Sequence, residues 1–89
     1  MITYERFEEI FNTTDSKWTG DNTFAGLLII SKYIDFKTKT IIEAAEHDII
    51  YSSEINDLIE AGITEEDVIS LAKLNWSFNT EYDCLSCFV

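Results

Sequence analysis

The most apolar stretch of the chain spans residues 24–34. Asp21 or Asn22, just before it, can cap a helix, so the pattern predicts a helix over about residues 23–34. Its apolar side chains fall on most sides of that helix rather than along a single stripe. We therefore expect the rest of the fold to cover this helix, which would place it at the centre of the core.

Three further helices are predicted from N-cap residues followed by apolar side chains at helical spacing. One runs to about Asn12, a short one covers residues 54–61, and the third ends near Asn75. Gly62 lies between the last two, where a left-handed residue ends a helix. Asp67 occupies the position of the second member of a capping box. The three N-cap residues are Thr3, Ser53 and Thr64.

Residues 40–53 fit two different structures. Ile41, Ala45 and Ile49 would align on one side of a helix, whereas alternate positions from Ala45 onward also suit the two faces of a strand. The isoleucine pairs of this segment disfavour a helix, because β-branched side chains are restricted there. The prediction is a strand over about residues 43–51, with a helix as the alternative.

Two more strands are predicted in the aromatic tail, over residues 76–78 and 84–88, with a turn at residues 79–83 between them. The chain of 89 residues is 46% hydrophobic, which suits one packed domain over residues 1–89. The predicted class is α+β, with about four helices packed on a short three-stranded antiparallel sheet.

The net charge of −11 is distributed unevenly. Residues 1–39 hold six acids and five bases, a net of −1, while residues 40–89 hold eleven acids and one base, a net of −10. The second half disfavours direct binding to nucleic acid, which depends on Lys and Arg. It suits a protein partner with a basic surface. The simplest interpretation is nevertheless that the acidic surface keeps a small protein soluble.

The candidate partner-binding residues are nine acids of this second half. Three recur at every third position of the short helix, three begin the next helix, and three lie in the segment before. A row of carboxylates spaced like phosphates can occupy a nucleic-acid-binding cleft. The alternative is a solvated surface with acids placed to suit the helix dipole. The nine residues are Glu43, Glu46, Asp48, Glu54, Asp57, Glu60, Glu65, Glu66 and Asp67.

Cys84 and Cys87 have the C-x-x-C spacing of some metal and redox sites. On a strand, positions three apart point to opposite faces, so the thiols would not converge. A zinc site takes four ligands, and a site that added His47 and either Asp48 or Glu46 is the alternative. We expect two small buried side chains and no metal or other cofactor. No nucleophile motif or phosphate-binding loop accompanies the histidine, so no enzymatic activity is predicted.

The N-terminus lacks the basic and apolar regions of a signal peptide. Two cysteines are too few for a secreted fold held by disulfides. No apolar stretch approaches the roughly 20 residues that cross a bilayer. We therefore expect a cytoplasmic protein with no membrane association.

Four stretches of the second half resemble small acidic proteins of phages and mobile elements, namely residues 45–51, 62–67, 75–76 and 84–89. No activity is assigned to those proteins, so the resemblance gives no residue a role. It implies a context in which small acidic proteins often bind and block host proteins.

These observations favour a non-enzymatic binding protein whose acidic half docks on a basic partner. Its sharpest form is a nucleic-acid-mimicking inhibitor of a host nucleic-acid-binding protein. The alternative is a module that self-associates as a homo-oligomer through apolar surface, with Trp18, Trp76 and Phe88 as candidate anchors. A small metal-binding protein that uses the C-x-x-C is a third hypothesis.

Overall fold

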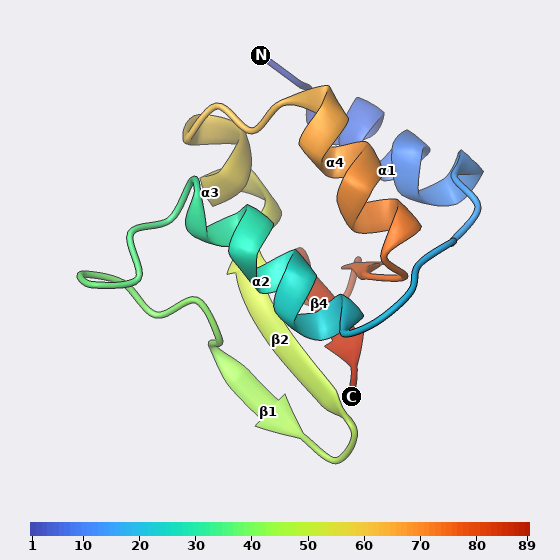
Figure 1. Ribbon diagram of the computed structural model, residues 1–89. Coiled ribbons are helices and arrows are strands. Elements are labelled where there is room, and N and C mark those ends of the chain that lie inside the picture. The colour runs from blue at the N-terminus through green and yellow to red at the C-terminus, as the bar shows by residue number, and fades with distance from the viewer.

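The computed structural model describes residues 1–89 and contains four helices and one four-stranded antiparallel sheet (Figure 1). The strand order is β1-β2-β4-β3. The predicted α+β class and the number of helices are confirmed, while the sheet has one strand more than predicted. The elements in chain order are α1 Tyr4–Thr13, α2 Asn22–Ser31, β1 Ala44–Glu46, β2 Ile49–Glu54, α3 Ile55–Glu60, α4 Glu65–Lys73, β3 Ser77–Asn79 and β4 Cys84–Phe88.

The additional strand arises because residues 43–51 do not form the single strand that we expected. His47 adopts a left-handed conformation with φ of 54°, and the chain reverses so that Glu46 pairs with Ile49. Side chains alternate between faces in both strands of a hairpin, so the period of two does not reveal the reversal. The hairpin places β2 in the middle of the sheet, against β4.

The predicted N-caps are confirmed at three of the four helices. At α2 the cap is Asp21, one of the two candidates, which accepts a hydrogen bond from the backbone N–H of Phe24 at 3.0 Å. Thr3 accepts a hydrogen bond from the backbone N–H of Arg6, and Thr64 accepts one from the N–H of Asp67, each at 3.1 Å. Ser53 is not a cap, contrary to prediction, because β2 continues through it and pairs with β4 as far as Glu54. The short helix α3 therefore begins with no side-chain cap.

α2 lies on the surface of the molecule, so the expectation that the rest of the fold covers it was wrong (Figure 1). Phe24 is 50% exposed and Leu28 is 57% exposed, whereas Gly26 and Ile30 are buried. The indole N–H of Trp76 donates to the carbonyl of Asn22 at 3.0 Å and seats the helix against the chain that follows α4. A ten-residue helix at the edge of a small core buries only the side that faces it.

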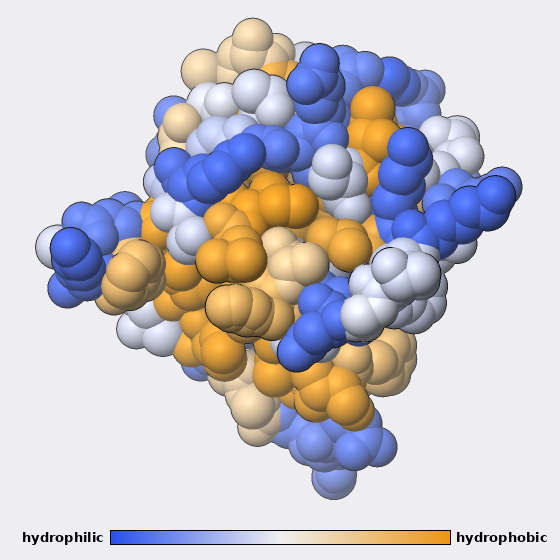
Figure 2. Space-filling model, viewed as in Figure 1, coloured by the Kyte–Doolittle hydropathy of each residue, from blue (hydrophilic) through white to orange (hydrophobic).

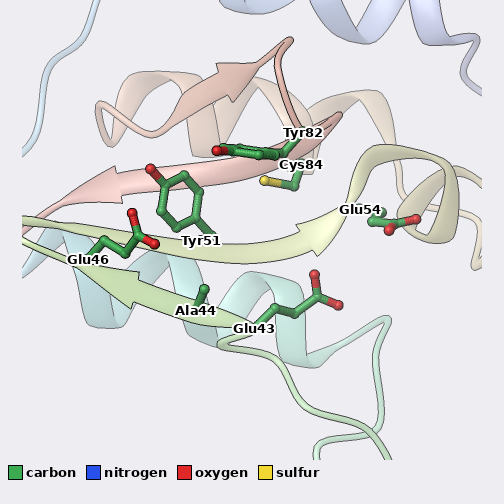
Figure 3. Close-up of a pocket in the computed structure, with 7 residues that line it drawn as sticks. All are labelled: Glu43, Ala44, Glu46, Tyr51, Glu54, Tyr82 and Cys84. Atoms are coloured by element: carbon green, nitrogen blue, oxygen red, sulfur yellow. The ribbon is translucent and has the colours of Figure 1, made fainter.

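The hydrophobic core lies between the helices and one face of the sheet (Figure 1). That face contributes Ile50, Leu85 and Cys87. The helices and their connections contribute Phe7, Ile10, Ile30, Ile34, Ile55, Leu58, Ile63, Val68, Leu71, Ala72 and Trp76. No helix covers the opposite face, where Tyr51 and Tyr82 lie beside Cys84 (Figure 3). This open face of the sheet is where the candidate site is found.

Candidate functional site

Two of the three acids at the start of α4, Glu65 and Asp67, are paired with basic side chains of the first half. Glu65 forms an ion pair with Arg6. The Lys32 ammonium lies 2.7 Å from the Asp67 carboxylate, which also accepts a hydrogen bond from Tyr33. Partial burial alone would raise the pKa of Asp67, but hydrogen bonds from Lys32 and Tyr33 outweigh it and lower that pKa. These acids are compensated within the chain, which weakens their attraction for a partner.

Three of the nine predicted acids instead surround a hollow on the open face of the sheet, which we call the acidic hollow (Figure 3). Glu43 precedes β1, Glu46 ends β1, and Glu54 ends β2. The hollow has a volume of about 360 Å³, and no Lys, Arg or His side chain lines it. Its lining residues are Glu43, Ala44, Glu46, Tyr51, Glu54, Tyr82 and Cys84.

Three residues that line the acidic hollow, Glu43, Tyr82 and Cys84, have raised pKa values. Partial burial raises the pKa of Glu43, and the charges of Glu54 and Asp57 raise it further. Burial likewise raises the pKa of the Cys84 thiol, and neighbouring carboxylates add to this effect. A neighbouring carboxylate charge is also the main cause of the raised pKa of Tyr82. Burial is the first cause of the shift at Glu43 and Cys84, and the charge of Glu81, which lies outside the hollow, is the first cause at Tyr82. Neighbouring carboxylates contribute to all three shifts, and a site lined by carboxylates without a basic side chain attracts a cation.

Two tyrosines complete the acidic hollow, and the sequence analysis did not identify them. The rings of Tyr51 and Tyr82 meet edge to face, with centroids 5.5 Å apart. Tyr82 comes from the turn before β4, where the Asn79 side chain accepts hydrogen bonds from the backbone N–H groups of Glu81 and Tyr82. The available signal was a tyrosine, Tyr82, within the predicted turn over residues 79–83. Aromatic faces attract cations, so these rings match the charge of the site.

The remaining predicted acids lie around or away from the acidic hollow. Asp57 on α3 lines an adjoining hollow that it shares with Glu43, and Glu60 lines another hollow beside Asp57. Asp48 lies in the turn of the hairpin, and its backbone carbonyl accepts a hydrogen bond from the N–H of Val89. Glu66 is exposed in the first turn of α4. The structure thus places Glu43, Glu46, Glu54 and Asp57 around two adjoining hollows, apart from the acids of α4.

The cysteines point to opposite faces of β4, as their spacing predicted. Cys84 lines the acidic hollow. The Cys87 thiol lies 3.7 Å from the amide nitrogen of Asn22 and 3.5 Å from the hydroxyl of Thr23, on the side of α2. His47 is exposed in the hairpin turn. No group of three or more His, Cys, Asp or Glu side chains is arranged to hold a metal ion.

A second feature is an apolar groove over α2, with a volume of about 260 Å³. Figure 2 shows the hydrophobic surface that surrounds it. Its lining residues are Phe24, Leu27, Leu28, Ser31, Phe36, Ile41 and Ile42. Of the anchors proposed for self-association, Trp76 is only 3% exposed, so that assignment was wrong, while Trp18 and Phe88 are exposed. Trp76 is covered because its indole ring packs beneath Gly26 of α2.

Comparison of this chain with known protein families, with curated proteins and with solved structures finds no match. No helix is long and apolar enough to cross a membrane; α1 and α2, the longest, have ten residues each. The functional argument therefore rests on the acidic hollow and the apolar groove.

Proposed function

We propose that this chain is a non-enzymatic binding protein whose open sheet face docks on a basic surface of a partner protein. The observation that carries the proposal is the acidic hollow, where three carboxylates surround a cavity that no basic side chain lines. Net charge alone can serve solubility. Charge that is concentrated around a cavity beside two tyrosines also supplies a shape and an attraction for a cationic group.

The sharpest form of the proposal is an inhibitor that acts in the host cytoplasm on a nucleic-acid-binding protein. The carboxylates of Glu43, Glu54 and Asp57 lie near one another, since two of them raise the pKa of the third. A partner that normally binds phosphates has Lys and Arg side chains that could bind these carboxylates instead. The resemblance to small acidic phage proteins gives the context for such an activity.

The test uses two doubly substituted variants with the same change of net charge. Glu54→Lys with Asp57→Lys reverses charge at the acidic hollow and at the adjoining hollow, and Glu5→Lys with Glu8→Lys makes the equivalent change on α1. Tagged wild-type and variant proteins are incubated with host lysate at low and high salt, and the bound proteins are identified by mass spectrometry. We expect a basic nucleic-acid-binding protein to be retained by the wild type and by the α1 variant, to be lost from the hollow variant, and to be released by salt.

Competition with duplex DNA tests the mimic specifically. Added DNA should release the captured partner from the tagged protein if DNA and the acidic hollow bind the same basic surface of that partner. Capture that survives charge reversal at the hollow, with the variant shown to be folded by circular dichroism, would sink the proposal.

The apolar groove supports a second candidate function, which is self-association through the α2 surface. Phe24 and Leu28 are large apolar side chains held half exposed on a helix, and such patches on soluble proteins often mark interfaces. Sedimentation of the purified protein should then show a dimer that does not weaken with salt, because apolar burial is not screened. Phe24→Ser with Leu28→Ser should make it monomeric. A wild type that is monomeric at all concentrations contradicts this function and leaves the first intact.

A further inference from the structure

We infer that the acidic hollow binds one arginine side chain of the partner, with the guanidinium group held near Glu43 and Glu54 and packed against the tyrosines (Figure 3). This inference rests on the proposed function and names the group that the site recognises. It names the side chain that occupies the acidic hollow, whereas the proposed function requires only that the acids around the hollow and on α3 attract a basic surface.

The first argument is the shape and lining of the site. Glu43, Glu46 and Glu54 come from different points of the hairpin, and their side chains line one hollow of about 360 Å³ (Figure 3). Cavities that hold small ligands begin at roughly 300 Å³, so this hollow suits one side chain rather than a helix or a strand. The rings of Tyr51 and Tyr82 form one wall and provide the aromatic surface on which a cation packs.

The second argument is an unpaired hydroxyl beside the acidic hollow. Ser53 is 3% exposed, and its hydroxyl oxygen has no hydrogen-bond partner. It lines the adjoining hollow together with Glu43 and Asp57, so Glu43 belongs to both cavities. Buried hydroxyl groups in folded proteins are nearly always paired. A donor that enters beside Glu43 would supply the missing partner.

The third argument is the number of acceptors that a ligand must satisfy. The carboxylates of Glu43, Glu46 and Glu54 can accept hydrogen bonds from several directions in the acidic hollow. The Ser53 hydroxyl group lies in the adjoining hollow, which shares Glu43. A guanidinium group offers five N–H donors in one plane, stacks on aromatic rings and loses its water easily. A lysine ammonium offers three donors from one point and is held more strongly by water. Lys39 lines the adjoining hollow but not the acidic hollow, so the chain supplies no cation of its own there.

The test is a titration of the isotope-labelled protein, followed by NMR, with N-acetyl-arginine amide and separately with N-acetyl-lysine amide. Arginine amide should shift the backbone signals of Tyr51, Ser53 and Tyr82, with a dissociation constant on the order of millimolar, which is usual for one exposed side chain. Lysine amide should bind at least about fivefold more weakly, because it makes fewer of the hydrogen bonds.

Two variants with equal charge make the titration specific. Glu43→Gln with Glu54→Gln should weaken arginine binding by about tenfold or more, since charge-assisted hydrogen bonds are lost. Glu5→Gln with Glu8→Gln on α1 should leave it within about twofold. Ser53→Ala should weaken binding without changing the overall spectrum, which shows that the variant is folded.

The outcomes separate the pocket from the proposed function. Equal affinity for the two amides, or equal loss in both charge variants, overturns the arginine site. Binding of a basic partner that is lost on charge reversal of Glu54 and Asp57 but unchanged in Glu43→Gln with Glu54→Gln supports the acidic surface and overturns the pocket. Arginine-selective binding supports the pocket whether or not a partner is captured from lysate. Failure to capture any partner contradicts the proposed function.

Discussion

At the scale of single residues, Gly26 determines how closely α2 approaches the core. A Cβ atom added at this position would overlap the indole ring of Trp76, which is itself buried. Gly26→Ala should therefore lower the free energy of unfolding by about 1–3 kcal/mol, the usual cost of overpacking. Helix propensity predicts the opposite sign, because alanine is favoured over glycine within a helix.

Urea denaturation of Gly26→Ala decides between these two expectations, and an unchanged or raised stability would contradict the packing of Trp76 against Gly26. Leu28→Ala, on the exposed side of the same helix, is the matched control and should change stability by under about 0.5 kcal/mol.

A second residue-scale prediction concerns Asp67, which joins α4 to the end of α2. Its side chain is 17% exposed and is bound by Lys32 and Tyr33. Burial acts to raise the pKa of this carboxyl, but the hydrogen bonds lower it overall. A lowered pKa contributes stability at neutral pH that is lost as pH falls through the folded-state pKa.

Asp67→Asn should therefore cost about 1–2 kcal/mol at pH 7, which is typical of charged hydrogen bonds. The difference from wild type should begin to shrink as the pH falls below the ordinary carboxyl pKa of 3.8, and it should be lost once the pH passes the lowered pKa of the folded state. Urea denaturation at several pH values measures both. Glu66→Gln, the exposed neighbour, is the control and should be nearly neutral. A cost that persists unchanged at pH 2 would mean that packing, rather than charge, explains it.

At the scale of elements, the β1–β2 hairpin depends on the left-handed backbone of His47. A non-glycine residue in that conformation costs about 1–2 kcal/mol, which a glycine would avoid. Glycine also has more conformational freedom in the unfolded chain, which offsets part of this gain in stability. His47→Gly should raise the free energy of unfolding by roughly 0.5–1 kcal/mol. Asp48→Gly, in the same turn but without positive φ, should lower it or leave it unchanged. Equal stabilisation by both substitutions would show that the turn is not formed in this way.

Element boundaries were predictable from sequence where local chemistry determines them. Thr3 and Thr64 cap helices because their hydroxyl groups lie three residues before a free backbone N–H, which is a purely local relation. The hairpin was missed because alternation looks the same before and after a reversal. The exposed side of α2 was missed because a helix that is apolar all round does not indicate which side the fold will leave uncovered.

The candidate site was predictable only in part, for a related reason. Its acids stand out by charge, and Glu43, Glu46 and Glu54 were identified among nine. Their separation from Glu65 and Asp67 depends on Arg6 and Lys32, which are distant in sequence and meet α4 only in the folded chain. Tyr51 and Tyr82 meet because β2 and the turn before β4 lie side by side. Such pairings follow from the order of strands in the sheet.

At the scale of the whole molecule, acid titration should act in two opposite directions. The pKa of Asp67 is lowered because hydrogen bonds from Lys32 and Tyr33 outweigh the opposing effect of burial, and a hydrogen bond from Arg6 lowers the pKa of Glu65. Protonation of these two carboxylates therefore destabilises the fold. Glu43 has a raised pKa, caused first by burial and then by repulsion from nearby carboxylates. A raised carboxyl pKa means that the ionised form is disfavoured in the folded state, so stability rises as pH falls through that pKa towards the ordinary value of 4.5.

Glu43→Gln should therefore stabilise the protein at pH 7, by a few tenths of a kcal/mol because the group is largely solvated. The gain should vanish below about pH 4.5, where the wild-type carboxyl becomes neutral too. Glu5→Gln on α1 is the control for lost charge without the hollow. The same Glu43 substitution should weaken binding of the arginine probe, so stability and recognition should change in opposite directions. Denaturation and titration of one variant at two pH values measure both effects. A variant that is less stable at pH 7 would mean that Glu43 is retained for folding, and that the repulsion in the acidic hollow does not serve a ligand.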